Sequence, residues 1–173
     1  MTHHITHTVR ADVSADEIWE VLSDFSSIEK TSHSVERSPI LSSVKSGVGT
    51  KRICHFYDSK SVVEEITHYQ EGQSFKIVLS EFSMPMKHIE AEFSVTRVSE
   101  TRSDISMSMD FTVKGGPLGW LLGATLLKPV LTKKVLVSEL LGIAYYAKTG
   151  KSIGKHMPNE SDFKISNVNI SAI

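Results

Sequence analysis

Two neighbouring segments in which apolar and polar residues alternate strictly constrain the fold of this chain more than any other feature. The first runs from Ile89 to Val95 and the second from Ile105 to Val113. Successive side chains of a β-strand point to opposite faces of its sheet, so this period of two predicts two strands that each bury one face. The short connection between the segments predicts an antiparallel pair whose apolar face is covered by a second layer.

A helical period replaces the alternation after the second segment. Residues 117–148 predict one long amphipathic helix, which begins at Pro117 and stops before Gly150. We expect Pro129 to kink this helix, because proline cannot donate an internal hydrogen bond. On a uniform helix the apolar side holds Leu126, Val130, Val137, Leu141 and Ala144, and the opposite side holds Lys128, Thr132 and Glu139.

The residues that precede these segments predict five further strands and two short helices. The strands are expected at Ile5–Val13, Val35–Ser42, Thr50–Tyr57, Ser61–Tyr69 and Phe75–Leu79. Ser14 and Glu17 have the spacing of a capping box, which predicts a helix start, and a second short helix is expected to begin in Asp24–Ile28. The result is an α+β arrangement in which the long helix lies across an antiparallel sheet of seven strands.

Composition and charge exclude several classes of protein. The chain has 173 residues, of which 40% are apolar and 23% charged, as is typical of one globular domain. A formal net charge of −1 argues against a general nucleic-acid binder. The single cysteine, Cys54, excludes an internal disulfide and favours a reducing compartment. We expect a cytoplasmic protein, since we find neither a signal peptide nor the run of about 20 apolar residues that spans a bilayer.

The hairpin around Ser59 brings polar residues together, and its register leaves two arrangements open. An even-residue loop places on one face with Glu64 the side chains of Ile53, His55, Tyr57 and Ile66. An odd-residue loop instead places on that face the side chains of Arg52, Cys54 and Phe56. A histidine and a carboxylate in a cavity are able to exchange a proton with a ligand, so His55, Glu64 and Tyr57 are candidate catalytic residues.

Several short motifs carry a resemblance to a known family. They are 13–19 (VSADEIW), 22–25 (LSDF), 47–52 (GVGTKR), 62–66 (VVEEI), 115–119 (GGPLG) and 148–150 (KTG). In this order of elements they resemble the SRPBCC superfamily of START-like and polyketide cyclase–dehydrase proteins, in its bacterial stand-alone branch. The likeness covers residues 5–150, so we expect a ligand-binding domain at 1–150 and a C-terminal extension at 151–173.

The resemblance implies a helix-grip fold, in which a curved sheet wraps around the long helix and leaves an apolar cavity between them. It implies a protein that binds a lipid-like or polyketide-like small molecule there, as a carrier or a sensor. The alternative is a cyclase, aromatase or dehydratase that moves protons with polar cavity residues. The expected partner is thus a hydrophobic ligand, without nucleic acid or stable membrane insertion. For residues 151–173 the sequence leaves two alternatives open, namely packing on their own domain or holding a second copy of the chain in a homo-oligomer.

The expected lining of the cavity combines sheet and helix residues. From the sheet we expect Ile53, His55, Tyr57, Glu64, Ile66, Ile77, Leu79, Ala91, Phe93, Met107, Met109 and Phe111. From the helix we expect Trp120, Leu126, Val130, Lys133 and Val137. Methionines suit a pocket that adapts to its ligand, and Lys133 is a candidate anchor for a ligand carboxylate. His3, His4 and His7 lack the partners and spacing of a zinc site, so neither a metal nor a cofactor is expected.

Overall fold

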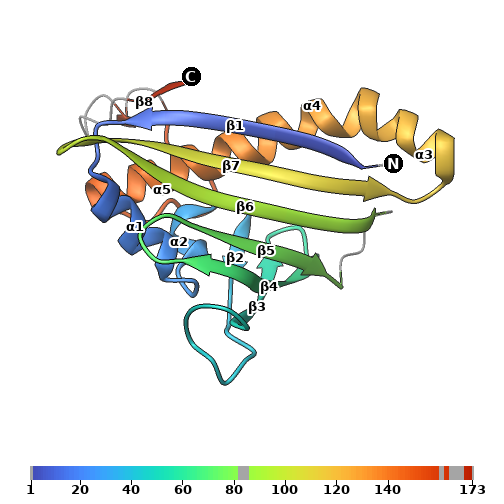
Figure 1. The fold of residues 1–173 in the computed structure, drawn as a ribbon, viewed down its shortest axis with the longest axis horizontal. Helices are drawn as coiled ribbons and strands as arrows, with labels where there is room; N and C mark the ends of the chain where they lie inside the picture. Colours follow the sequence, from blue (N-terminus) through green and yellow to red (C-terminus); the bar gives the residue numbers. More distant parts are fainter. Residues whose placement is uncertain (1, 82–85, 160–161, 164–169, 173) are drawn as a thin grey trace.

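The computed structural model describes residues 2–81, 86–159, 162–163 and 170–172. A long helix lies across one face of an antiparallel sheet, so the molecule has two layers (Figure 1). This is the α+β helix-grip fold that the sequence predicts, and the prediction is confirmed. The sheet is curved, and its concave side faces the helix.

The described part of the sheet has eight strands in the order β2-β3-β4-β5-β6-β7-β1-β8, and each neighbouring pair is antiparallel. The strands are β1 (His3–Ala11), β2 (Val35–Arg37), β3 (Lys51–Phe56), β4 (Ser61–Gln70), β5 (Ser74–Ser80), β6 (Met86–Ser99), β7 (Arg102–Val113) and β8 (Ile170–Ala172). The first seven correspond to the seven predicted strands. The short edge strand β2 ends before Pro39, because proline cannot donate to a strand ladder.

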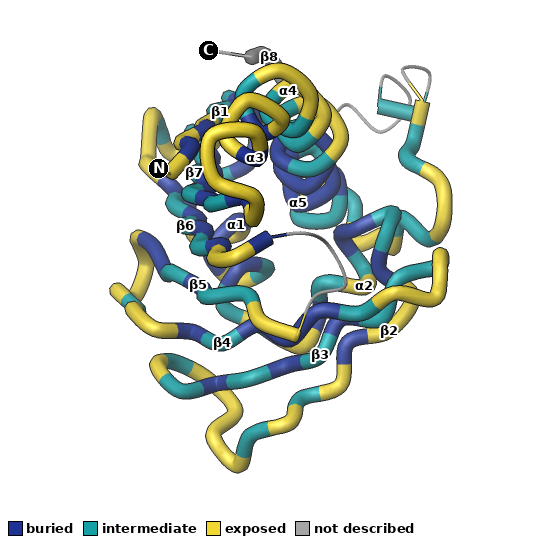
Figure 2. Tube along the Cα trace, turned by 90° about the vertical axis from the view of Figure 1, so that its right-hand side faces the viewer, coloured by how far each residue is buried: buried dark blue, intermediate teal, exposed yellow. Residues whose placement is uncertain are grey.

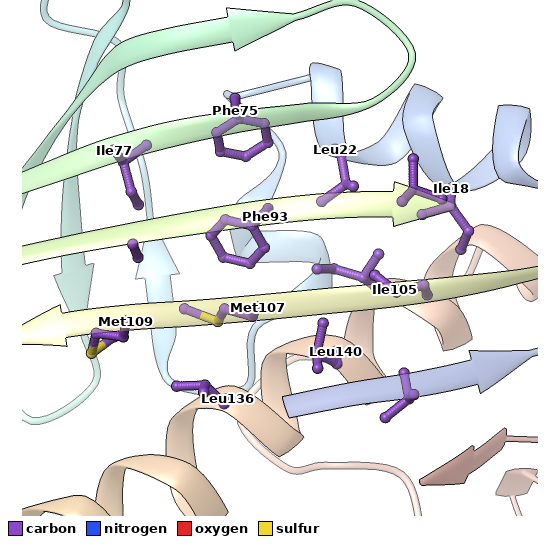
Figure 3. Packing of buried hydrophobic residues seen from close by; sticks show 14 of the residues in the cluster. Ile18, Leu22, Phe75, Ile77, Phe93, Ile105, Met107, Met109, Leu136 and Leu140 are labelled. Carbon is purple, nitrogen blue, oxygen red and sulfur yellow. The ribbon is translucent and has the colours of Figure 1, made fainter. Parts of the chain in front are cut away.

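The alternation in β6 and β7 determines which side chains meet the helix. Phe93 lies opposite Met107 and Ala91 lies opposite Met109 in the register of the two strands, and all four residues are buried. Figure 3 shows that the apolar side chains of β5, β6 and β7 point to the same side of the sheet as the helix residues Leu136 and Leu140. Their burial supplies the largest share of the driving force for folding.

Seven helical segments lie in the described residues before 160. They are α1 (Ala15–Ser23), α2 (Ile28–Thr31), α3 (Gly116–Leu122), the π-helical turn η1 (Gly123–Leu127), α4 (Lys128–Leu131), the π-helical turn η2 (Thr132–Leu136) and α5 (Val137–Thr149). The predicted capping box begins α1, since Ser14 Oγ accepts from Glu17 N at 3.3 Å while the Glu17 carboxylate accepts from Ser14 N at 3.0 Å. Gly150 ends α5 with φ of +67°, as expected of a left-handed helix stop.

The pieces from α3 to α5 form one continuous helix, and its two π turns explain which side faces the sheet. A row of residues spaced by four contacts the sheet, the core or the cavity, namely Gly119, Gly123, Leu127, Leu131, Val135, Glu139 and Ile143. In a regular α-helix each step of four residues rotates a position by about 40°, so such a row would leave the face within a few turns. The two π turns contain more residues per turn, so they rotate the row back to the face that meets the sheet. The helix continues through Pro129, with η1 directly before it.

Gly142 allows α5 to lie directly against the end of α2. A Cβ atom at this position would lie 1.9 Å from the carbonyl oxygen of Thr31, so a larger residue would push the two helices apart. This close approach matters for the site, because Ser32 follows Thr31 and forms a hydrogen bond to Glu139 on the same helix.

The described parts of the C-terminal extension contact their own domain. The backbone N–H of Ile153 donates to the carbonyl oxygen of Lys30 at 2.9 Å, and the ring of Phe163 lies 5.3 Å from that of Tyr145. Strand β8 then pairs with the Val9–Ala11 end of β1. The division of the chain at residue 150 and the binding of a second copy through residues 151–173 stay predictions.

Candidate functional site

A cavity of about 300 Å³ lies between the sheet and the long helix. Most of its lining is apolar. The sheet contributes Cys54, Phe56, Val62, Ile77, Leu79, Met86, Ile89, Ala91, Phe93, Met107 and Met109, and the helix contributes Leu131 and Val135. Asp58, Lys60 and Lys134 also line it and are exposed, so they mark its open end. Glu64 and Glu139 are buried polar members of the lining.

Seven residues expected in the lining are placed there by the structure. They are Glu64, Ile77, Leu79, Ala91, Phe93, Met107 and Met109. The strict alternation of β5, β6 and β7 turns six of these side chains to the concave face, and Glu64 reaches it from β4. Two other expected residues, Ile66 and Phe111, are buried in the core next to the cavity and do not line it.

The register of the β3–β4 hairpin resolves the two arrangements that the sequence leaves open. Arg52 lies opposite Glu64, and His55 lies opposite Ser61 with the odd-residue loop 56–60 between them. The side chains on the face of Glu64 are therefore those of Arg52, Cys54 and Phe56. Ile53, His55 and Tyr57, which an even-residue loop would place there, lie outside the cavity lining. The proposed catalytic set of His55, Glu64 and Tyr57 is thus not assembled.

The expected helix residues also need correction. Leu126 and Val130 are exposed, Trp120 stacks on the ring of His3, and neither Lys133 nor Val137 lines the cavity. Leu131, Lys134, Val135 and Glu139 line it instead. A helical wheel with a uniform period cannot find them, because η1 and η2 change the phase of the helix. The row of residues spaced by four was the sequence signal that would have found Leu131, Val135 and Glu139.

Arg52 is the centre of a buried polar cluster at one end of the cavity. Its Nε donates to Glu64 Oε2 at 2.7 Å, and its Nη2 lies 2.5 Å from the same oxygen. Its Nη1 donates to the carbonyl oxygen of Phe25 at 2.6 Å, and the guanidinium lies 3.8 Å from the centre of the Phe25 ring. These contacts fix the Arg52 guanidinium beside the Glu64 carboxylate. Removal of either charge would leave the other buried without a partner, which is strongly destabilising.

Glu139 is the second carboxyl of the cluster and has a different environment. Ser32 Oγ donates to its Oε1 at 2.6 Å, while its Oε2 is buried without a hydrogen-bond partner among the described residues. Burial raises the pKa of Glu139 to about 7, although the Ser32 hydrogen bond and the nearby Arg52 act in the opposite direction. A carboxyl with this pKa is able to donate or accept a proton near neutral pH inside an apolar cavity.

The dependence of folding stability on pH is expected to reveal Glu139. Since its pKa rises from 4.5 to about 7 on folding, the folded chain holds a proton between these values that the unfolded chain has released. The free energy of unfolding is therefore expected to fall as the pH rises through this range, by about 3 kcal/mol relative to Glu139→Gln. Urea denaturation of both proteins at a series of pH values measures the difference. Parallel curves for the two proteins would contradict a buried, protonated carboxyl.

Neither a reactive thiol nor a metal-binding cluster is found in the site among the described residues. The Cys54 thiol donates to Glu64 Oε2 at 3.7 Å, and burial raises its pKa, so the unreactive thiol form persists. The described residues include no group of three or more His, Cys, Asp or Glu side chains able to hold a metal ion. Within the same residues, no helix has both the length and the apolar character needed to cross a membrane.

Comparison with models of protein families gives one match. Residues 2–136 match the family described as polyketide cyclase / dehydrase and lipid transport. The chain belongs to this family. The match includes every strand that lines the cavity and the helix as far as Leu136, and the sequence resemblance to the SRPBCC superfamily is thereby confirmed. Among curated proteins, none matches the chain significantly in sequence.

Solved structures show the same fold as this member of the polyketide cyclase/dehydrase and lipid transport family. The Zhui aromatase/cyclase from Streptomyces sp. R1128 is 18% identical and superposes with a TM-score of 0.70, covering 85% of this chain and 94% of its own. Norcoclaurine synthase from Thalictrum flavum, in complex with dopamine and hydroxybenzaldehyde, is 20% identical with a TM-score of 0.66, covering 88% and 90%. The protein XoxI from Bacillus cereus is 13% identical with a TM-score of 0.63, covering 81% and 94%.

Proposed function

We propose that the protein binds an apolar small molecule, lipid-like or polyketide-like, that carries one hydroxyl or carbonyl group. The observation that supports this function is the cavity of about 300 Å³ with an apolar wall and Glu139 at its polar end. This volume is at the small end of the range of ligand pockets, about 300–1,000 Å³, and suits a compact ligand. The buried Oε2 of Glu139 then gains the hydrogen-bond partner that the described residues do not supply.

Desolvation of the ligand is the main source of affinity in this proposal. Apolar area that leaves water contributes about 25 cal/mol per Å². Met107 and Met109 lie in the wall of the cavity, where flexible and polarisable side chains adapt to ligands of different shape. The polar group adds orientation more than affinity. Such a protein serves as a carrier or a sensor, and the buried Cys54 suits a cytoplasmic location, which we also propose.

A specific observation favours an enzyme as the second candidate. Glu139 has a pKa of about 7 and a free oxygen, whereas Glu64 is held by Arg52. Two carboxyls with such different environments are the arrangement that acid–base catalysis uses. In a cyclase, aromatase or dehydratase, Glu139 would transfer a proton to or from a carbonyl or hydroxyl of the bound substrate. Chemical turnover of a bound ketone or alcohol would separate this candidate from a carrier.

A pair of probes that differ only in one hydroxyl group tests the proposed function. We expect 2-naphthol to bind about tenfold more tightly than naphthalene, because one hydrogen bond to Glu139 contributes about 1.5 kcal/mol. Fluorescence titration of the wild-type protein measures both affinities. In Glu139→Leu, which keeps the cavity apolar, the preference for 2-naphthol is expected to disappear while naphthalene still binds.

Two further measurements make this experiment decisive. Circular dichroism checks that Glu139→Leu is folded, and His55→Leu is the matched control, because His55 lies outside the cavity lining. The control is expected to keep the preference of the wild-type protein. Binding of neither probe to the wild-type protein would overturn the proposed function. Equal binding of both probes would overturn the role of Glu139.

A further inference from the structure

The first half of the long helix presents large apolar side chains to solvent. Six residues of this segment are exposed, namely Leu118, Trp120, Leu121, Leu122, Leu126 and Val130. Leu118 has an exposed fraction of 77% and Leu126 of 55%, so more than half of the surface of each residue is in contact with solvent. Figure 2 shows α3 and α4 as a largely exposed part of the helix, whereas α5 is largely buried. An exposed apolar patch of this kind marks a surface that binds a protein, a membrane or a ligand.

The charged residues within and directly flanking this segment of the chain all have the same sign. No acidic residue occurs between Asp110 and Glu139, and the same segment contains Lys114, Lys128, Lys133 and Lys134. The whole chain nevertheless carries a net charge of −1, so the acidic residues are concentrated elsewhere. On β6, Glu90 and Glu92 alternate with the buried Ile89, Ala91 and Phe93, which turns them to the convex side of the sheet, away from the helix.

The fold holds the patch in place and leaves it uncovered by the described parts of the C-terminal extension. The indole of Trp120 stacks on the ring of His3 at 5.6 Å, and the buried Gly119 lies against the backbone of Lys114. Phe163 contacts α5, and β8 pairs with the Val9–Ala11 end of β1. These contacts lie at the opposite end of the sheet from His3, so they do not reach the patch.

We propose that the segment from Leu118 to Val130 docks on an anionic lipid surface. Its leucines and Trp120 enter the boundary between head groups and acyl chains, and the lysines remain beside the lipid phosphates. Tryptophan is enriched at this depth of a bilayer because its ring is amphipathic. Charge argues against a second copy as the occupant, since a symmetric contact through this patch would bring the lysines of both copies together without an acidic partner.

Docking would place the cavity next to the lipid. Leu131, Lys134 and Val135 line the cavity and follow the proposed docking segment directly in the same helix. The proposed association with the membrane is peripheral, since no described helix is able to span a membrane. The inference stands on the exposed patch and its charge, and it does not depend on the identity of the cavity ligand.

Sedimentation with lipid vesicles tests the proposal. We expect the wild-type protein to bind vesicles of an equimolar mixture of phosphatidylcholine and phosphatidylserine more tightly than vesicles of phosphatidylcholine alone. Leu118→Ser/Leu121→Ser is expected to lower the partition coefficient by about tenfold or more, because two exposed leucines leave the interface. Lys128→Gln/Lys133→Gln is expected to remove the preference for phosphatidylserine. The fluorescence of Trp120 is expected to shift to shorter wavelength on binding, whereas Trp19 is already buried.

The control variant changes exposed apolar residues elsewhere. Leu41→Ser/Val48→Ser alters two exposed side chains of the 38–50 segment and is expected to bind vesicles as the wild-type protein does. An equal loss in this control, or no binding of the wild-type protein to anionic vesicles, would overturn the proposal. The proposal would also be overturned if the wild-type protein formed a dimer, did not bind vesicles, and became a monomer in Leu118→Ser/Leu121→Ser. That result would identify a second copy as the occupant. If the segment bound an acidic protein and no vesicles, the proposal would likewise be overturned, and the occupant would be an acidic protein.

Discussion

Replacement of Arg52 by Met is expected to lower the free energy of unfolding by about 3–5 kcal/mol at neutral pH, because it leaves the Glu64 carboxylate buried without its cation. Arg52 is 4% exposed and Glu64 is 8% exposed, so bulk water solvates neither group well. The change also removes the hydrogen bond to the Phe25 carbonyl oxygen and the contact with the Phe25 ring. Urea denaturation of the wild-type and variant proteins measures the loss.

Two comparisons identify the cause of this loss. The double variant Arg52→Met/Glu64→Leu removes both charges and is expected to recover most of the stability, since an apolar pair replaces the ion pair. Arg97→Met breaks the exposed pair between Arg97 and Asp16 and is expected to have a much smaller effect, because water solvates both groups. If Arg52→Met were no more harmful than Arg97→Met, the buried ion pair would not have the role described.

Replacement of Ala91 by Trp is expected to abolish the binding of apolar probes. Ala91 lies in the middle of β6, opposite Ile77 on β5 and Met109 on β7, and all three residues line the cavity. An indole at this position would occupy much of the cavity of about 300 Å³. Affinity for 2-naphthol is expected to fall by about 100-fold or more, since the ligand loses most of the apolar area that it buries. Fluorescence titration measures the change.

The folding of this variant has to be checked separately. Overpacking costs about 1–3 kcal/mol in a filled core, and an empty cavity reduces that cost, so Ala91→Trp is expected to remain folded by circular dichroism. Val48→Trp adds the same side chain at an exposed position and serves as the control. Unchanged affinity in a folded Ala91→Trp variant would mean that the probe binds outside the cavity.

The alternation of apolar and polar residues predicted the sheet well because each strand has one buried face. In β6 and β7 the period of two continues for many residues, and Ala91, Phe93, Met107 and Met109 follow from it directly. The hairpin of β3 and β4 did not follow from the sequence. Its register depends on the parity of the loop 56–60, in which Ser59 has φ of +67° without being glycine. A change of one residue in that loop exchanges His55 for Cys54 on the concave face.

The helix side of the site was missed for a different reason. A uniform period placed Glu139 on the polar side and Leu126 and Val130 on the apolar side, whereas Glu139 is buried and the other two are exposed. The two π turns shift the phase of the helix and depend on its packing against the sheet, so a helical wheel cannot represent them. The raised pKa of Glu139 likewise follows from burial between distant elements, because its hydrogen-bond partner Ser32 lies 107 positions away in the chain.

Native mass spectrometry tests the central claim, that the cavity holds an apolar ligand, most directly. The wild-type protein and Ala91→Trp are isolated without denaturation and incubated with the same panel of apolar alcohols, ketones and fatty acids. The proposal predicts that the wild-type protein carries one bound molecule per chain and that Ala91→Trp carries none. A wild-type protein that stays empty with every member of the panel would contradict the proposal, as would equal loading of the two proteins.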